Sequence, residues 1–281
     1  MDPSPRRPRV GHIDFLNCLP LYDGLVRSGG LLDVRLRRDT PDRLNDLLLA
    51  GELDIGPISL VPALQHAEEL RVLPGLAVGS DGPVLSVVLV TTVPVADLGG
   101  RRVALGATSR TSVLLAQLLL AQRWGVAAEF EVMPPDLGAM LRSADAAVLI
   151  GDPALRATYE APGNGLHVID LGAAWRDWTG LPMVFAVWAA RRDYCEQHPD
   201  IVAAVQLSFT RSLRASLERV DEVAEHAARW EPFDAGTLAR YFRALDFRLG
   251  ARQVEGVREF ARRGAELGAL PSGAALRFAP S

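Results

Sequence analysis

Hydroxyl-bearing side chains crowd one short stretch of the chain, and this stretch is where the sequence first offers chemistry. The segment Arg102–Leu120 reads as a short apolar strand, a loop of small residues and a helix that begins at about Ser112. The loop and the first helical turn contain Thr108, Ser109, Thr111 and Ser112. Ser and Thr satisfy the free backbone N–H groups at a helix start, and the same groups, with the positive end of the helix dipole, attract anions. The stretch is therefore predicted to be either a well-capped helix start or a turn that binds a negatively charged ligand.

The composition excludes several kinds of chemistry and of partner. The chain has no lysine, so all 30 of its basic residues are arginine, which excludes a lysine Schiff base, pyridoxal-phosphate chemistry and a P-loop. Two cysteines and five dispersed histidines show no metal-ligand spacing. A net charge of −4 argues against nucleic acid and anionic membranes as partners. We therefore expect no metal and no cofactor.

Length and hydropathy indicate a globular protein. The chain has 281 residues, of which 49% are hydrophobic and 23% charged, enough for two domains or one large one. No apolar run reaches the length of a membrane span. His12 and Asp14 interrupt the apolar region that a secretory signal would need, so we expect a cytoplasmic protein. The oligomeric state stays open.

The elements that must position the hydroxyl loop repeat along the chain. The first half reads as strand, helix, strand, helix, strand, with strands at Val10–Phe15, Leu32–Leu36 and Asp54–Ser59 and helices from Pro20 to Gly29 and from Thr40 to Ala50. The second half repeats this order, with Arg102–Leu120, a strand at Ala127–Val132, a helix to about Ser143 and a strand at Ala146–Gly151. Strands that alternate with helices predict parallel sheets.

Two β-branched runs, Ser86–Thr92 and Met183–Ala190, predict strands that carry the chain between two units. The region Pro199–Leu270 is helical by its periodicity, with Asp234 as a cap and Gly250 as a break. This order predicts the α/β class and a two-lobed, periplasmic-binding-protein-like (type 2) fold. We expect one lobe from residues 1–91 and 186–281 and the other from residues 92–185. Ligands of such sheets bind outside the carboxyl ends of the strands, so the loops at residues 17 and 109 are predicted to face each other across a cleft.

Six segments, in order and at compatible spacing over residues 9–191, resemble the chorismate dehydratase family of the futalosine route of menaquinone biosynthesis. They are GHIDFLNCLPLYDGL, GELDIGPIS, SDGPVLSVVLV, ATSRTS, AAVLIGDPAL and DLGAAWRDWTGLPMVFAVWAAR. The resemblance implies a hydro-lyase that removes water from chorismate and yields 3-[(1-carboxyvinyl)oxy]benzoate. Chorismate carries two carboxylates, which agrees with the anion-receptive helix start.

The resemblance also implies roles for particular residues. The family's opening Asn falls on Asn17 and the Ser at the start of the crossover strand on Ser86, and both are expected to act on the substrate. The residues expected to bind the substrate are Ser109, Thr111 and Ser112, which would hold a carboxylate, Gly151 and Asp152 at the facing strand end, and Ser59 at the corresponding end in the first lobe.

The chemistry constrains what these residues can do. Loss of the ring hydroxyl requires a proton to be removed from the neighbouring ring carbon and a hydrogen-bond donor for the leaving oxygen. The candidate loops offer mostly amides and hydroxyls, and neither Asn nor Ser is a competent base unaided. We therefore hypothesise that the enolpyruvyl carboxylate of the substrate is the base, and that Asn17 and Ser86 orient it and stabilise the departing hydroxyl.

Other interpretations remain open. Asn17 also suits an ordinary turn, and Asp152 suits a helix cap beside Pro153. One rival function is 1,4-dihydroxy-6-naphthoate synthase of the same route, whose Ser-Pro-Cys-Pro-Asn-like opening is replaced here by FLNCLPL. Another is a non-catalytic small-carboxylate binding protein, which as a transporter component would need an export signal and as a regulator a helix-turn-helix segment.

Overall fold

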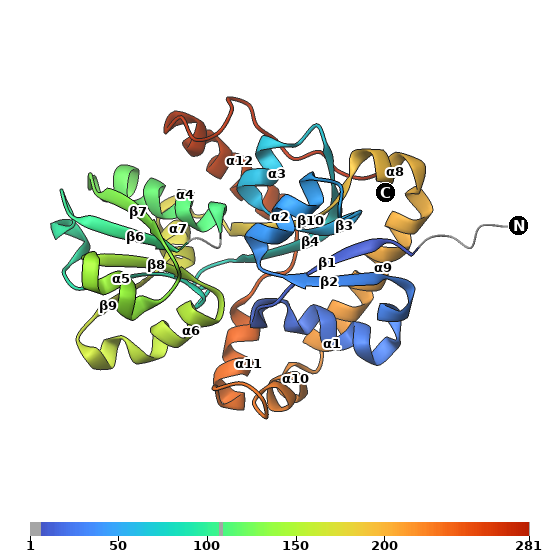
Figure 1. Ribbon diagram of the computed structural model, residues 1–281, viewed down its shortest axis with the longest axis horizontal. Coiled ribbons are helices and arrows are strands. Elements are labelled where there is room, and N and C mark those ends of the chain that lie inside the picture. Colours follow the sequence, from blue (N-terminus) through green and yellow to red (C-terminus); the bar gives the residue numbers. More distant parts are fainter. Residues whose placement is uncertain (1–6, 107–108, 281) are drawn as a thin grey trace, which may run out of the picture.

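The computed structural model describes residues 7–106 and 109–280, apart from the side chains of residues 31 and 32. Two lobes lie side by side, each built on a five-stranded sheet with helices packed against it (Figure 1). This is the predicted two-lobed α/β architecture. Ala107 and Thr108, the latter one of the four hydroxyl residues singled out above, lie outside the described residues.

The first sheet has the order β2-β1-β3-β10-β4. Its strands are β1 (Arg9–Ile13), β2 (Arg35–Asp39), β3 (Ile55–Ser59), β4 (Leu70–Ser80) and β10 (Met183–Arg191). The helices of this part of the chain are α1 (Leu19–Ser28), α2 (Pro41–Leu49) and α3 (Leu60–Gln65). Strands β1, β2 and β3 are parallel, whereas β10 runs antiparallel to β3 and β4, so the sheet is mixed and not purely parallel as expected.

The second sheet has the order β7-β6-β8-β5-β9. Its strands are β5 (Val87–Thr91), β6 (Arg102–Gly106), β7 (Glu129–Met133), β8 (Ala146–Ile150) and β9 (His167–Asp170). Its helices are α4 (Arg110–Leu118), α5 (Leu137–Ser143), α6 (Gly151–Glu160) and α7 (Leu171–Thr179). Here β6, β7 and β8 are parallel and β5 is antiparallel to both of its neighbours, the same mixture as in the first sheet.

The internal repeat is confirmed at the level of single residues. In the first lobe, Arg9 at the start of β1 pairs with Asp54, which precedes β3. In the second lobe, Arg101 directly before β6 pairs with Asp145 directly before β8, at 2.8 Å. Each ion pair ties together the amino ends of the two equivalent strands in its own lobe.

The two predicted crossover strands are present as β5 and β10, but their pairing does not agree with the predicted boundaries between the lobes. A limit between residues 91 and 92 assigns β5 to the first lobe, yet β5 pairs with β8 and β9 of the second sheet. A limit between residues 185 and 186 splits β10, yet Met183 and Val184 already pair with β4 of the first sheet. The chain therefore crosses between the end of β4 and the start of β5, and returns between the end of α7 and the start of β10.

The last third is helical, as predicted, with α8 (Arg192–Gln197), α9 (Pro199–Leu217), α10 (Val220–Ala227), α11 (Ala235–Ala244) and α12 (Ala251–Glu266). The side chain of Asp234 caps α11, and Gly250 is the N-cap of α12. These helices do not all belong to the first lobe. On α12, Arg263 lies over the ring of Trp178 at 3.6 Å, and that ring belongs to α7 of the second lobe.

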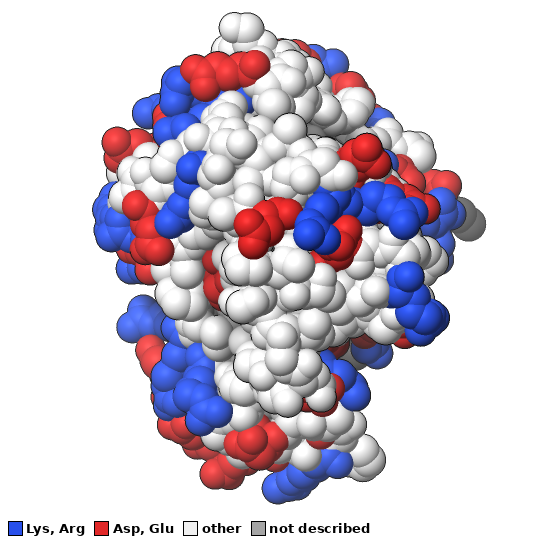
Figure 2. All heavy atoms as spheres, turned by 90° about the vertical axis from the view of Figure 1, so that its left-hand side faces the viewer, with Lys and Arg blue, Asp and Glu red and all other residues white. Residues whose placement is uncertain are grey.

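Charges of both signs alternate over the end face of the second lobe (Figure 2). Among the described residues, no helix is long and apolar enough to cross a membrane. Within the same residues, no group of three or more His, Cys, Asp or Glu side chains is placed to hold a metal ion. The cytoplasmic location and the lack of a cofactor stay predictions.

Candidate functional site

The eight predicted site residues all lie at the carboxyl edges of the two sheets. Ser59 ends β3, and Asn17 follows β1 in a short 3-10 helix, η1 (Leu16–Cys18). Ser109 to Ser112 follow β6, and Gly151 and Asp152 follow β8. Ser86 joins the same edge because β5 is antiparallel, so that Val87 at its amino end pairs with Ile150 at the carboxyl end of β8. The topology thus brings segments far apart in the sequence to the junction between the lobes.

Around Asn17 the two lobes touch directly. The backbone N–H of Leu16 in η1 donates to Oδ1 of Asp152 on α6 at 3.1 Å. Gly151 has a φ of +64°, and a Cβ at this position would lie 3.0 Å from the ring of Phe15. Glycine is therefore needed both for the backbone conformation and for the close approach of the two lobes. The side-chain Oδ1 of Asn17 is buried here without a hydrogen-bond partner among the described residues.

Ser86 is held by a strained turn. The preceding residue, Leu85, has a φ of +64°, which is uncommon for a branched side chain. The carboxylate of Asp170 accepts the N–H groups of Val84 and Leu85 at 2.9 and 2.7 Å. The carbonyl of Ser86 accepts the N–H of Gly151 at 2.8 Å, and the Ser86 side chain is 2% exposed. Several hydrogen bonds thus hold the turn in its strained conformation, as is common for backbone strain at functional sites.

In this structure the predicted anion-binding hydroxyls cap helix α4 and join the two lobes. Helix α4 begins at Arg110, earlier than predicted, and Ser109 is its N-cap, accepting the N–H of Ser112 at 3.3 Å. Thr111 is fully buried, and its Oγ1 accepts the N–H of Val61 in α3 at 3.1 Å. In this conformation the oxygen of Thr111 therefore joins the two lobes.

Ser59, one of the predicted substrate-binding residues, makes hydrogen bonds that stabilise the first lobe. Asn45 on α2 donates to the Oγ of Ser59 at 3.2 Å and accepts the Ser59 N–H at 2.9 Å. Both residues are buried, so the pair fixes the end of β3 and the start of α3. Its role in substrate binding stays a prediction.

The lobes are closed on each other. Besides the contacts at Leu16 and Thr111, Arg110 on α4 pairs with Asp42 and Asp46 on α2, both at 3.1 Å. Ser86, Thr111 and Ser112 are each at most 2% exposed. In this conformation the interlobe contacts therefore shut these side chains off from solvent.

Two ionisable groups beside Asn17 have strongly shifted pKa values. Burial raises the pKa of the Asp152 carboxyl to about 6, although the hydrogen bond from Leu16 opposes the shift. Burial, with the charge of Asp152 nearby, raises the pKa of the Cys18 thiol. Cys18 therefore stays a protonated wall residue, whereas Asp152, predicted from the sequence as a substrate-binding residue, is a carboxyl group at the junction whose pKa burial brings to about 6.

Tyr241 was not among the residues predicted from the sequence. This tyrosine comes from α11, in the helical third that carried no motif, and it is completely buried. Its environment includes Ser86, Asp152 and Cys18, all of which act on the pKa of its phenol. The missing signal is tertiary, because nothing in the local sequence of α11 distinguishes Tyr241 from a core aromatic residue.

Comparison with known proteins places this chain in a family. A model of the family described as menaquinone biosynthesis matches residues 8–266. The chain belongs to this family. Chorismate dehydratase of Thermus thermophilus is 35% identical over 237 residues, covering 79% of this chain and 83% of that protein. These matches confirm the resemblance predicted from the sequence.

Other relatives of this menaquinone-biosynthesis protein are more distant. The 1,4-dihydroxy-6-naphtoate synthase of Streptomyces coelicolor is 28% identical over 268 residues, 90% of this chain and 89% of that protein. Among solved structures, the alkanesulfonate-binding protein of Xanthomonas axonopodis bound to MOPS has a TM-score of 0.72 at 16% identity and covers 97% of both chains. The protein AF1704 of Archaeoglobus fulgidus also has a TM-score of 0.72, at 22% identity, covering 94% of this chain and 98% of that one. At these identities the structures show the fold alone, which is the predicted periplasmic-binding-protein-like fold.

Two hollows of this family member differ in their relation to the junction. A cavity of ≈ 410 Å³ is lined by Leu16 and Asp152 and extends past His12 to Trp230. Burial lowers the pKa of His12 to about 4, so this histidine is neutral at pH 7 and suits a wall residue. The cavity borders the site on the side of α1 and α10.

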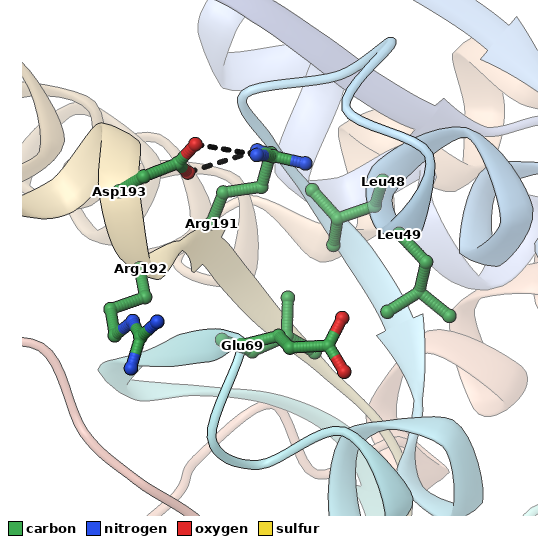
Figure 3. Close-up of a pocket in the computed structure, with 7 residues that line it drawn as sticks. Leu48, Leu49, Glu69, Arg191, Arg192 and Asp193 are labelled. Atoms are coloured by element: carbon green, nitrogen blue, oxygen red, sulfur yellow. Dashed lines mark hydrogen bonds and ion pairs between the residues drawn. The ribbon is translucent and has the colours of Figure 1, made fainter.

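The second hollow is a pocket of ≈ 160 Å³ between Leu48, Glu69 and Arg192. Figure 3 shows that Arg191 in its wall is already bonded to Asp193. Because Arg191 is at the far end of β10 from the residue that pairs with Ser59, this pocket lies at the opposite edge of the sheet. It contains none of the predicted site residues.

The raised pKa of Asp152 leads to a prediction about stability. The folded chain holds the proton of Asp152 more tightly than the unfolded chain does, so protonation stabilises the fold. This contribution to the free energy of unfolding is complete below about pH 4 and is lost as the pH rises through about 6. We expect Asp152→Asn to remove this dependence, because an amide brings no charge into the junction and its oxygen still accepts the Leu16 N–H. Near pH 7.5 the variant is expected to be more stable by up to about 3 kcal/mol, and this gain shrinks as the pH falls from 6 to 4.

Urea unfolding of both proteins between pH 4 and 8 measures the difference. Asp200→Asn is the matched control, because Asp200 also occupies the first turn of a helix but is exposed. A stability difference between Asp152→Asn and the wild type that does not change with pH would contradict the prediction.

Proposed function

We propose that this protein is a chorismate dehydratase, a carbon–oxygen hydro-lyase that converts chorismate to 3-[(1-carboxyvinyl)oxy]benzoate and water. The proposal is carried by the position of Asn17 and Ser86, the two residues that the family resemblance implies for catalysis. They lie on segments tied to each other through α6, because Leu16 bonds to Asp152 and Ser86 bonds to Gly151. The Thermus relative, which bears the name chorismate dehydratase, supports the same activity.

The reaction is an elimination that makes the ring aromatic. The proton on the ring carbon that carries the enolpyruvyl ether is removed, its C–H electron pair enters the ring, and the C–O bond to the neighbouring hydroxyl breaks. The departing oxygen leaves with a proton as water, and the enolpyruvyl ether is retained. A group that takes the carbon-bound proton and a donor for the departing oxygen are sufficient for this step.

Asn17 and Ser86 suit the second of these tasks. The amide of Asn17 and the hydroxyl of Ser86 can each donate a hydrogen bond, and Ser86 and the Oδ1 atom of Asn17 are buried at the closed junction. Fixed donors in a site without water stabilise developing negative charge more strongly than the same donors in solution. The hydroxyls of Thr111 and Ser112, at the start of α4, are left to bind a substrate carboxylate.

For the proton acceptor we retain the enolpyruvyl carboxylate of the substrate. This carboxylate is two bonds from the ether oxygen on the ring carbon that loses its proton. Closure of the lobes can therefore hold the carboxylate beside the proton that it removes. Asp152 is the competing protein group, with a pKa of about 6 that suits a general base. Its carboxylate already accepts the Leu16 N–H, however, and this contact gives it a part in joining the lobes.

The test is conversion of chorismate by the purified protein. Ultraviolet absorbance follows the change from cyclohexadiene to benzoate, and mass spectrometry of the product reports the loss of one water. Steady conversion to the aromatic enolpyruvyl ether supports the dehydratase. Saturable binding of chorismate without conversion would overturn the proposal in favour of a small-carboxylate binding protein.

A further inference from the structure

Helix α11 is fixed at both ends, so the side chains between them are held in place. Asp234 caps its start and accepts the N–H of Thr237 at 2.8 Å. After its end, Asp246 exchanges backbone hydrogen bonds with Gly79 of β4 at 2.8 and 2.7 Å, and Phe247 accepts the N–H of Ala77 at 3.0 Å. The segment that follows the helix is therefore attached to β4 of the first lobe, and Figure 1 shows α11 at the junction of the two lobes.

From this helix the phenol of Tyr241 reaches the site. The residue is fully buried, and Ser86 is close enough to lower the pKa of its phenol through hydrogen bonding, with the charge of Asp152 and the thiol of Cys18 in its surroundings. Burial raises the pKa of the Tyr241 phenol, so the group is a neutral hydrogen-bond donor at pH 7. Three separate parts of the chain thus meet here, from η1, from β5 with α6, and from α11.

The hydroxyl of Tyr241 makes no hydrogen bond of regular geometry with the described residues. Another buried tyrosine shows what a purely structural one does, because the hydroxyl of Tyr22 donates to the carbonyl of Gly11 at 3.0 Å. Burying a hydroxyl without a partner costs about 1–3 kcal/mol, and a phenylalanine would fill the same space without that cost. An unsatisfied buried donor beside a reacting group is a feature of a site that completes its bonds when the ligand is bound.

We propose that Tyr241 is a positioning residue for the proposed dehydration: with the substrate between the lobes, its phenol donates to Oγ of Ser86, so that the Ser86 proton points to the departing hydroxyl. In the absence of this bond the Ser86 hydroxyl turns to the carbonyl of Val84, which it reaches at 3.5 Å. The inference rests on the proposed function, because it assigns Tyr241 a part in the same elimination.

The experiment compares Tyr241→Phe with the wild type in the chorismate assay and in thermal unfolding. We expect kcat to fall by about 10- to 100-fold, KM to change by less than about twofold, and Tm to stay equal or rise, because the unpartnered hydroxyl is gone. Tyr194→Phe is the matched control. Its hydroxyl is also buried without a partner, but Tyr194 belongs to α8, near Arg9 and Asp54 at the other end of the first sheet. This control is expected to keep the wild-type kcat.

A double variant tests whether Tyr241 acts through Ser86. Adding Tyr241→Phe to Ser86→Ala is expected to lower kcat no further, because the group that Tyr241 positions is already missing. An additional loss in the double variant overturns the proposed route, and so does a Tyr241→Phe enzyme with wild-type kcat. A fall in Tm together with a rise in KM indicates a structural role and also overturns it. A wild-type protein that binds chorismate without converting it overturns the proposed function itself, which distinguishes the two failures.

Discussion

Replacement of Ser86 by alanine is expected to lower kcat for chorismate by about 10²- to 10³-fold, while KM changes by less than about threefold. Asn17→Ala is expected to give a loss of the same order. Both side chains are assigned to the departing hydroxyl, whose charge develops only in the transition state, so their removal raises the barrier and hardly changes ground-state binding. Initial rates over a range of chorismate concentrations separate the two parameters.

Two substitutions of the same kind serve as controls. Ser143→Ala removes a hydroxyl on α5 that bonds to the carbonyl of Met140, and Asn164→Ala removes an exposed amide beyond α6. Neither residue lies at the junction, so we expect wild-type kinetics from both. The assignment is wrong if Asp152→Asn alone abolishes turnover while Asn17→Ala and Ser86→Ala remain active, because Asp152 would then be the residue on which the chemistry depends.

Much of the site was predictable because the relevant residues follow parallel strands. Once β1, β3, β6 and β8 are recognised as alternating with helices, their carboxyl ends must share an edge. Asn17, Ser59 and the Ser109–Ser112 turn then face the junction, as the structure has them. The repeat of element order between the halves was visible for the same reason, and the equivalent pairs Arg9–Asp54 and Arg101–Asp145 show that it extends to side chains.

The remainder depends on tertiary contacts that no local pattern encodes. The sequence analysis did not predict β4 or β9, and it assigned β5 to the wrong sheet, because a β-branched run does not reveal its pairing partner. Asp152 was predicted as a site residue, but the rise in its pKa was not, because it comes from burial in the folded protein, which no local sequence pattern reports. Tyr241 could not be found, since its meaning depends on α11 being anchored to β4 and on the lack of a partner for its hydroxyl.

These contacts explain how a fold shared with ligand-binding proteins can carry out a reaction. The lobes supply hydroxyls, an amide and two helix starts from opposite sides, and the hydroxyl residues are buried where the lobes meet. In the proposed mechanism the substrate brings its own proton acceptor, so the protein needs accurate placement more than a strong base. Accurate placement in turn requires that the turn before Ser86 be rigid.

That rigidity leads to the second large effect, expected for Asp170→Ala. The carboxylate of Asp170 accepts the N–H groups of Val84, Leu85 and Ala173, and so holds the turn before Ser86 to the start of α7. Without it, three part-buried donors lose a charged partner, and Leu85 loses the contact that holds its positive φ. We expect the free energy of unfolding to fall by about 4 kcal/mol and kcat to fall at least about 10-fold, because Ser86 is no longer held in place. Urea unfolding and the chorismate assay measure the two effects.

Asp136→Ala is the control that distinguishes loss of a helix cap from loss of the strained turn. Asp136 caps α5 in the same lobe and accepts the N–H of Ala139 at 2.6 Å, but it holds no strained turn. Its removal is expected to lower the free energy of unfolding by about 1 kcal/mol and to leave kcat unchanged. If Asp170→Ala costs no more stability than Asp136→Ala and retains full activity, the strained turn at Leu85 is not what positions Ser86. If Asp170→Ala loses activity and also loses much more unfolding free energy than Asp136→Ala does, the carboxylate of Asp170 on the neighbouring strand holds Ser86 in position.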